Sequence, residues 1–234
     1  MNNFRTVSDT KRTFYSRHTR PINTIYRRVV EELMVEMHLL SVNVDFSYNS
    51  IYALGVVTTF DRFMQGYQPS EDLVSIFNAI ICAVEQDPQV YSQDAAKLKA
   101  IANSFSVKDL IAWCSQTTPL DQDTNLQAEL QAIAQNPNFK YSRLLAIGLF
   151  SLLELSDPEF VKDETQRNQA IAVIAQGLKL SEDKLNKDLD LYRSNLDKME
   201  QALIVMADML AADRKKRDQR QQNSGNPALP PTNE

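Results

Sequence analysis

The sequence predicts an all-α protein: a helical bundle that carries a long coiled-coil-like C-terminal helix and a disordered tail. Apolar residues recur at three- and four-residue spacing through most of the chain, which is the pattern of amphipathic helices. No segment alternates apolar and polar residues at length, and the hairpin dipeptides Asn-Gly and Asp-Gly do not occur. Only 5 glycines stand against 9 prolines, which disfavours a sandwich, a barrel or a glycine-rich nucleotide-binding fold.

The chain has 234 residues, of which 43% are hydrophobic, so it can form one domain with an appendage. The longest apolar runs, 73–84 and 144–153, fall well short of the roughly 20 residues that span a bilayer, and no integral membrane segment is expected. We expect four segments: a basic N-terminal segment at 1–20, a helical bundle at 21–178, a long projecting helix at 181–218 and a disordered tail at 219–234.

The bundle should begin with an amphipathic helix of about five turns. Pro21 suits the first position of a helix, where its missing N–H would have no partner anyway. Apolar residues then repeat at helical spacing from Ile22 to Leu40. Residues 42–46 interrupt this period and are expected to form a connector.

Two segments are apolar almost all round, and such helices belong in the centre of a bundle. The first begins at Asn49 and is expected to end near Gly66, before Pro69. The second covers residues 141–155. We expect these two helices to form the core.

Shorter helices should complete the bundle. Ser70 is the expected N-cap of a helix that Asp87 and Pro88 close. Two short helices follow at 95–105 and 106–114.

The second of these short helices has a clear start signal, because Ser106 and Asp109 resemble a capping box in which Asp replaces Glu. A loop and a helix around 126–133 come next. The last bundle helix is centred on 170–175, and Gly177 stands where a left-handed residue would end it.

From Ser181 to about Asp218 the apolar residues follow an unbroken period of 3.5, the seam of a left-handed coiled coil or of a long packed helix. At 1.5 Å per residue this helix would be about 55 Å long, so we expect it to project from the domain. The flanking heptad positions carry little complementary charge, so a parallel homodimer is barely specified. The seam residues are Leu185, Leu189, Tyr192, Leu196, Met199, Leu203, Met206 and Leu210.

The apolar stretch at 202–210 is wider than a coiled-coil seam and needs a cover. It either packs antiparallel on the chain's own helices or docks on another protein. Removing everything from Ser181 onward should separate these alternatives. If the stretch packs on the chain's own helices, the remaining chain should unfold; if it docks on another protein, the remaining chain should stay a stable core. The candidate partner interface is Leu203, Met206, Met209, Leu210, Arg214, Lys215, Lys216 and Arg217.

The net charge of −5, from 25 basic and 30 acidic residues, argues against nucleic-acid binding. The charge is unevenly distributed, because seven basic residues up to Arg28 face only Asp9, and a second basic run covers 214–217. Two basic ends on an acidic body suit peripheral contact with anionic lipid or with an acidic partner. Each run alone is also compatible with ordinary solvated surface charge.

The sequence contains no recognisable catalytic, cofactor or metal centre, so an enzyme is not expected. Bundle metal sites need Glu three residues before His, and Val35 holds that position before His38, which is therefore expected to be structural. Cys82 and Cys114 lie in apolar helical pattern and are expected to be buried free thiols. Asp61, on a helix expected to be buried, should form a structural ion pair with an arginine.

Aromatic residues gather around the first apolar helix. They either pack in the core, which is the commoner arrangement, or line a groove for a lipid or a pigment. The second arrangement would make the protein a lipid- or pigment-binding peripheral membrane protein. The residues are Phe46, Tyr48, Tyr52, Phe60, Phe63 and Tyr67.

Several stretches of the sequence resemble the thylakoid formation protein family, whose members are also called photosystem II biogenesis proteins. The N-terminal ones are residues 6–15 (TVSDTKRTFY), 18–23 (HTRPIN) and 26–40 (YRRVVEELMVEMHLL). The later ones are 52–55 (YALG) with 60–67 (FDRFMQGY), and 141–149 (YSRLLAIGL) with 153–154 (LE). The resemblance covers roughly residues 6–215.

This resemblance implies an all-helical, non-catalytic protein that serves thylakoid membrane biogenesis and the assembly or repair of photosystem II. It implies that the protein binds and supports the thylakoid FtsH protease, or binds photosystem II assembly intermediates. The expected location is the thylakoid membrane, peripheral on the cytoplasmic side, and the cytoplasm. Plastid members carry a long transit peptide, whereas this chain starts almost at the first motif, which points to a cyanobacterial member. The family has no established catalytic residues.

Overall fold

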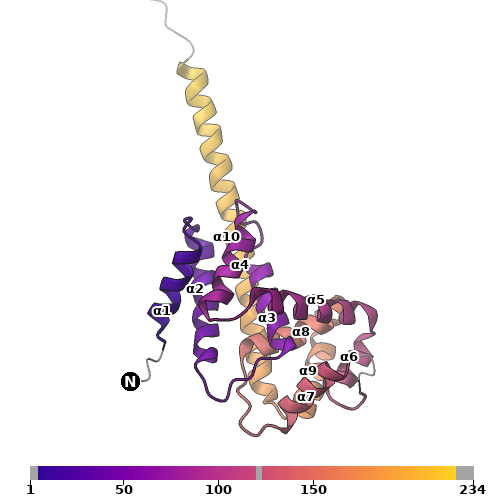
Figure 1. The fold of residues 1–234 in the computed structure, drawn as a ribbon. Helices are drawn as coiled ribbons and strands as arrows, with labels where there is room; N and C mark the ends of the chain where they lie inside the picture. The colour runs from indigo at the N-terminus through magenta and orange to yellow at the C-terminus, as the bar shows by residue number, and fades with distance from the viewer. Residues whose placement is uncertain (1–4, 120–122, 225–234) are drawn as a thin grey trace, which may run out of the picture. The chain divides into compact units, whose positions relative to one another are not determined.

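The structure is a computed structural model that describes residues 5–119 and 123–224 (Figure 1). Over these residues the chain forms ten α-helices and one short 3₁₀ helix, with no strand, which confirms the all-α prediction. None of these helices combines the length and the apolar character that crossing a bilayer requires.

The chain divides into two compact units, Met1–Arg193 and Ser194–Glu234. The boundary lies inside the last helix, so about three turns of that helix belong to the first unit. The helices are α1 (Val7–Arg17), α2 (Thr24–Ser41), α3 (Ser50–Phe63), α4 (Asp72–Ala83), α5 (Pro88–Ser104), α6 (Val107–Cys114), α7 (Thr124–Gln135), α8 (Arg143–Ser156), η1 (Phe160–Lys162), α9 (Glu164–Leu178) and α10 (Glu182–Ser224).

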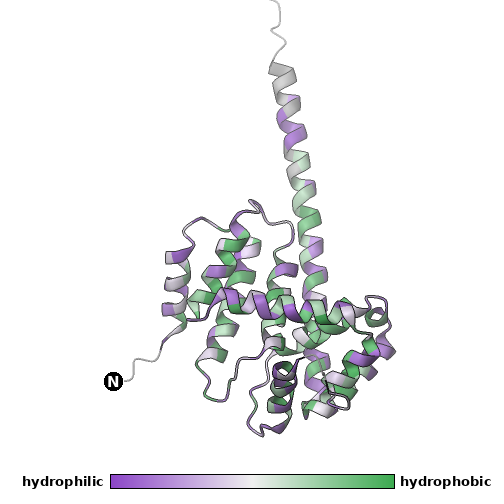
Figure 2. Ribbon diagram, turned by 45° about the vertical axis from the view of Figure 1, so that its right-hand side comes forward, coloured by the Kyte–Doolittle hydropathy of each residue, from purple (hydrophilic) through white to green (hydrophobic). Residues whose placement is uncertain are grey.

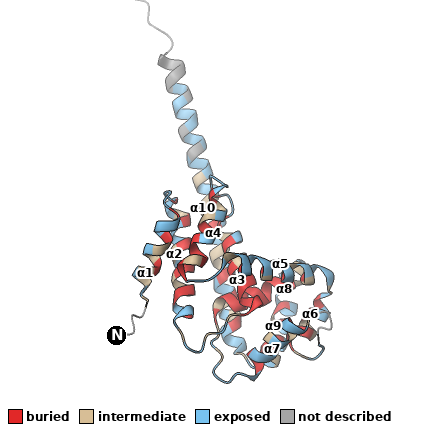
Figure 3. Ribbon diagram, viewed as in Figure 1, coloured by how far each residue is buried: buried red, intermediate tan, exposed pale blue. Residues whose placement is uncertain are grey.

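Helices α3 and α8 form the core of the first unit, as their apolar character predicts. Residues 144–153 of α8 and 50–56 of α3 are all buried, and Figure 3 shows much of both helices in the colour of buried residues. Two glycines allow the helices to approach closely: a Cβ on Gly55 would overlap the carbonyl oxygen of Leu144, and one on Gly148 would overlap that of Ile51. The pair therefore crosses backbone to backbone.

The other helices of the first unit cover this central pair. Helix α5 packs on both α3 and α8, while α1 packs on α4 and α2. Helices α6 and α7 pack on α9, and α6 also reaches α8. The connector at 42–46 is confirmed as a turn between α2 and α3.

Two predicted helix starts are wrong because other residues supply the caps. Helix α2 begins at Thr24 instead of Pro21, since the Asn23 side chain accepts a hydrogen bond from the N–H of Ile25. Helix α4 begins at Asp72 without a side-chain cap, so Ser70 does not have the predicted role.

Asp87 and Pro88 start a helix instead of closing one. The Asp87 carboxylate accepts from the N–H of Gln89 at 2.8 Å, and Pro88 occupies the first turn of α5. The helix expected at 95–105 is therefore about two turns longer. At the next helix the predicted cap is confirmed, because the N–H of Asp109 donates to Oγ of Ser106 at 3.2 Å.

Gly177 does not end α9, contrary to the prediction. It lies inside the helix, where a Cβ would overlap the backbone of Ser115, so it is a close-approach residue. The left-handed position after α9 is taken by Lys179, at φ 56° and ψ 36°. Glycine therefore serves packing at this place, and a lysine accepts the unfavourable backbone conformation.

Helix α10 continues to Ser224, six residues beyond the predicted end at Asp218. Hydrophobic and hydrophilic turns follow each other along it (Figure 2). Residues 225–234 of the predicted tail and residues 120–122 of the predicted loop lie outside the described residues.

Candidate functional site

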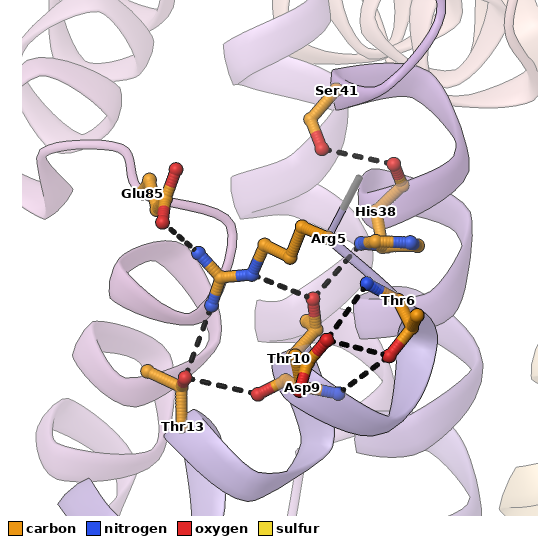
Figure 4. Close-up of polar contacts among 8 residues, drawn as sticks. All are labelled: Arg5, Thr6, Asp9, Thr10, Thr13, His38, Ser41 and Glu85. Carbon is orange, nitrogen blue, oxygen red and sulfur yellow. Dashed lines mark hydrogen bonds and ion pairs between the residues drawn. The ribbon is translucent and has the colours of Figure 1, made fainter. Parts of the chain in front are cut away.

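Arg5 anchors the first helix to the rest of the bundle. Its guanidinium donates from Nε to Oγ1 of Thr10 at 3.2 Å and from Nη2 to Oγ1 of Thr13 at 3.0 Å, and it forms an ion pair with Glu85 beyond α4 (Figure 4). Oγ1 of Thr10 lies 2.9 Å from Nδ1 of His38 on α2. This network therefore joins α1, α2 and the turn that follows α4.

His38 is a structural member of this network, as expected. Its side chain is buried, and this burial lowers the pKa of the imidazole, with the nearby charge of Arg5 acting in the same direction. Within the described part of the chain, no group of three or more His, Cys, Asp or Glu side chains could hold a metal ion.

Helix α1 is missing from the sequence-based prediction, which placed only a basic segment at 1–20. The signal was present as a capping box at Thr6 and Asp9. The N–H of Thr6 donates to Oδ2 of Asp9 at 3.0 Å, and the N–H of Asp9 donates to Oγ1 of Thr6 at 3.2 Å. Hydrogen bonds from Thr6 lower the pKa of Asp9. The same Asp-for-Glu variant was recognised at Ser106, so the pattern was readable.

The basic residues near the N-terminus are largely engaged within the protein. Five of them form ion pairs, and the Arg20 partner, Asp72, is buried. Three of these pairs join different elements of the bundle, whereas the pairs of Arg12 and Arg28 lie within one helix and leave both arginines exposed. The pairs are Arg5–Glu85, Lys11–Glu31, Arg12–Asp9, Arg20–Asp72 and Arg28–Glu32.

A groove of about 990 Å³, lined mainly by charged and polar residues, lies between α2, the start of α8 and the first turns of α10. On its wall Arg143 forms an ion pair with Glu36, and the hydroxyl of Tyr141 donates to Oδ2 of Asp188 at 2.8 Å. Nζ of Lys184 lies 4.6 Å from the centre of the Tyr141 ring. These contacts fasten the start of α10 to the bundle.

Glu36 is a mostly buried carboxylate on the wall of this groove. Burial raises its pKa, and the neighbouring Arg143 only partly opposes this effect. Hydrophobic contacts reinforce the attachment of α10, because Leu185 and Leu189 are buried and the Tyr192 ring packs 5.9 Å from that of Phe63. The first turns of α10 are thus part of the core of the first unit.

The aromatic residues around α3 mainly pack against other rings. Phe46 lies 5.0 Å from Tyr52, and Phe60 lies 5.2 Å from Phe77, in edge-to-face geometry. Tyr48 also contacts Tyr52, at 6.3 Å. Core packing, the commoner arrangement, therefore describes most of this set.

An apolar groove of about 590 Å³ nevertheless borders these rings, between α3, α4 and α5. Phe60, Tyr67 and Phe77 line it, and Val74 on its rim is 69% exposed. Its volume lies in the range of small-molecule sites.

Two predictions about single residues need correction. Asp61 is exposed, not buried, and its partner at 3.2 Å is Nζ of Lys99 on α5, not an arginine. Its neighbour Arg62 forms an ion pair instead, with Glu154 at 2.7 Å. Of the two free thiols, Cys114 is buried, and burial raises the pKa of its thiol to about 12, whereas Cys82 is half-buried.

The predicted partner interface lies entirely on α10, in the second unit. Leu203 and Met206 are half-buried, Met209 is 65% exposed, and the four basic residues at 214–217 are exposed. Leu210 belongs to the same helix, but its side chain is outside the described part of the structure.

Two more apolar residues of the second unit are exposed and were not in the predicted interface. Ile204 is 56% exposed and Val205 is 52% exposed. Both lie in the apolar stretch 202–210 that was expected from the sequence to need a cover, although only its seam positions and Met209 were assigned to the interface. The signal that identifies them is the uninterrupted apolar run at 203–206.

These features define a class: all-helical bundle proteins with a long C-terminal helix that carries neighbouring exposed apolar side chains, here Ile204, Val205 and Met209, an arrangement that favours macromolecular contact. Comparison with known proteins refines this class. The chain matches the thylakoid formation protein family over residues 6–221 and belongs to that family, which is implicated in thylakoid formation and photosystem II.

Relatives and a solved structure agree with this assignment. Protein Thf1 of Nostoc punctiforme is 74% identical over 232 residues, which cover 99% of both chains. Protein Thf1 of Crocosphaera subtropica is 58% identical over 217 residues, or 93% of this chain and 88% of that protein. A solved structure of Psb29 is 43% identical, covers 84% of this chain and 98% of its own, and gives a TM-score of 0.71.

Proposed function

We propose that this protein is a non-catalytic accessory factor for thylakoid membrane biogenesis and for the assembly or repair of photosystem II. In this proposal it binds and supports the thylakoid FtsH protease, or binds photosystem II assembly intermediates, through the second half of α10. Family membership supports a role in thylakoid formation and photosystem II, and the surface of α10 supports partner binding as the way in which the protein acts.

The observation that carries the proposal is an apolar surface on α10 followed by positive charge. Ile204, Val205 and Met209 are each more than half exposed, and four exposed basic residues follow at 214–217. Burying such side chains against a partner removes apolar area from water, at roughly 25 cal/mol per Å². Basic residues beside it would select an acidic partner surface.

The test is co-purification from cyanobacterial thylakoids with a tagged full-length chain. The double variant Ile204→Asp/Val205→Asp places two charges on the apolar surface and should reduce recovery of FtsH at least about tenfold, a loss of some 1.4 kcal/mol or more. Val44→Asp is the matched control, because Val44 is 97% exposed on the first unit and should leave recovery unchanged.

The outcomes separate the parts of the proposal. Equal recovery by both variants would remove the apolar surface of α10 from the mechanism. Absence of FtsH from the preparation of the unaltered chain would contradict the choice of partner. Point variants are preferable to deletion of 181–218, because that deletion also removes Leu185 and Leu189 from the core of the first unit.

The proposal includes a peripheral location on the cytoplasmic side of the thylakoid membrane and in the cytoplasm. The exposed basic run at 214–217 supports contact with anionic lipid, whereas the N-terminal basic residues are mostly engaged in ion pairs. Liposome flotation should show binding that needs anionic lipid and weakens with salt. Binding that is indifferent to salt would contradict this route.

A second candidate function is lipid or pigment binding, which the apolar groove lined by Phe60, Tyr67 and Phe77 favours. Solvent extraction of the protein purified from thylakoids, followed by mass spectrometry, should then release about one acyl lipid or pigment molecule per chain. An extract free of both would contradict this candidate.

A further inference from the structure

Both histidines of the chain lie at the contacts that hold α1 in place. Nδ1 of His18, the residue that ends α1, lies 3.0 Å from Oγ of Ser75 on α4. Nδ1 of His38 on α2 lies 2.9 Å from Oγ1 of Thr10 on α1. The two histidines are only 2% and 3% exposed. Since α1 packs on α4 and on α2, each of these two contacts contains one buried imidazole.

The hydrogen bonds around His38 require an imidazole without a proton on Nδ1. Nε of Arg5 can only donate, and it donates to Oγ1 of Thr10 at 3.2 Å (Figure 4). The Thr10 hydroxyl keeps its own hydrogen to donate, and Nδ1 of His38 is the acceptor that faces it. A proton on Nδ1 would replace this acceptor by a donor and would place a positive imidazolium beside the guanidinium of Arg5.

His18 is equally unsuited to carry a charge in the closed protein. Its Nδ1 faces the hydroxyl of Ser75, whereas its Nε2 is buried and has no hydrogen-bond partner among the residues that the structure describes. The nearby carboxylate of Asp72 already pairs with Arg20 at 2.7 Å, so the two together present little net charge to the ring. An imidazolium would therefore bury an N–H and a positive charge without a partner, which is costly.

Burial lowers the pKa of both imidazoles, and the neighbouring charges do not reverse this effect. Each ring faces one acidic group, which opposes the effect, and one arginine, which adds to it. Both histidines therefore bind a proton more readily in water than in the closed protein, so protons favour any state in which α1 has left its place. The charged neighbours are Asp72 and Arg20 for His18, and Arg5 and Asp9 for His38.

We propose that α1 is a pH-controlled lid, which proton uptake by His18 and His38 releases from α2 and α4 while the other helices stay folded. Release separates each ring from its hydroxyl partner, and each ring takes one proton from the solvent. It also exposes Phe14, which is 0% exposed in the closed protein, and the faces of α2 and α4 that α1 covers. Acidification is thereby converted into exposure of apolar surface.

The ion pairs that also hold α1 respond to acid at a lower pH. Arg5 pairs with Glu85 and Lys11 with Glu31, and such carboxylates stay charged down to about pH 4. A hydrogen bond from Lys11 lowers the pKa of Glu31 further. A buried neutral histidine instead stabilises the closed state fully above its free pKa of about 6.5, and this contribution falls as the pH drops below that value. The lid should therefore open between about pH 6.5 and pH 5.

Hydrogen–deuterium exchange of the full-length chain at about pH 7.5 and about pH 5.5, corrected for the intrinsic pH dependence of exchange, tests the proposal. The amides of α1 should lose about 10- to 100-fold of their protection at the lower pH, the upper value being the limit for two histidines that bind no proton in the closed state. The fluorescence of Trp113, buried on α6, should stay native. Unchanged protection of α1 would overturn the proposal, and so would loss of the native Trp113 signal together with that protection.

Two further measurements assign the effect to the histidines. In His18→Asn/His38→Asn each asparagine keeps a polar group near the former Nδ1 and has no group that titrates in this range, so α1 should be protected equally at both pH values. The same loss of protection as in the unaltered chain would overturn the proposal. Proton NMR of the unaltered chain, which needs no variant, should show both imidazoles titrating below about pH 6.5, and two unshifted titrations would overturn it as well.

Discussion

Truncating one aliphatic side chain of α10 in each unit should show how differently the two halves of this helix contribute to stability. Leu185 is 0% exposed in the first unit, whereas Ile204 in the second is 56% exposed. Burial of this kind makes Leu→Ala cost about 2–5 kcal/mol, from lost transfer energy and the cavity that remains. An exposed Ile→Ala should change the free energy of unfolding by less than about 0.5 kcal/mol.

Urea unfolding provides the assay, with the fluorescence of Trp113 as the probe. This residue is the single tryptophan of the chain and is buried in the first unit. With a denaturant slope of about 2 kcal/mol per M, Leu185→Ala should lower the midpoint by about 1–2.5 M. Ile204→Ala should move it by no more than about 0.25 M.

Two results of the urea experiment would refute this reasoning. Equal shifts from Leu185→Ala and Ile204→Ala would mean that the two halves of α10 contribute alike to the stability of the bundle. A shift below about 0.25 M for Leu185→Ala would show that the first turns of α10 are not part of the core.

Three further changes test individual contacts. Gly148→Ala should destabilise the first unit by about 1–3 kcal/mol in the same urea assay, because overpacking against the Ile51 carbonyl outweighs the gain of about 1 kcal/mol in helix propensity; unchanged stability would refute the close crossing of α3 and α8. Lys179→Gly should raise stability by about 0.5–1 kcal/mol, since φ is 56° there and glycine accepts it without strain; a lower midpoint would contradict that reasoning. Burial lowers the pKa of His38 below 6.5, so the unfolded chain binds more protons and stability should fall as pH drops below about 6.5. His38→Gln should flatten this dependence relative to the unaltered chain, and an identical pH profile would count against a neutral, buried His38.

Helical periodicity was sufficient to find the core but not the ends of the helices. The segments that form α3 and α8 are apolar on almost all sides, so their composition alone predicted that they would be buried in the centre of the bundle. The residue at which a helix begins depends on which of several neighbouring polar side chains acts as the N-cap. Asn23 caps α2 two residues after Pro21, and Asp87 begins α5 where it was expected to end the previous helix.

The contacts around Arg5 could not be predicted from local pattern. Thr10 and His38 are 28 positions apart, and Arg5 reaches Glu85 in a turn formed after another helix. Only the packing of α1 on α2 and α4 brings these groups together. The resemblance motif at 6–15 identified the segment as unusual, yet the role of its polar residues in anchoring α1 emerges from tertiary structure.

The seam of α10 shows why a regular sequence pattern leaves its partner undetermined. The same 3.5-residue period runs through Leu185, Leu189 and Tyr192, which are buried, and continues to Leu203 and Met206, which are half-buried. Periodicity records that one face of a helix is apolar, and it does not record whether the cover comes from the same chain. The two alternatives weighed for the stretch 202–210, packing on the chain's own helices and docking on another protein, concern a later part of the helix, so the burial of Leu185, Leu189 and Tyr192 does not decide between them. A cut before Ser181 removes both parts together and cannot distinguish them, whereas substitutions at 185 and at 204 can.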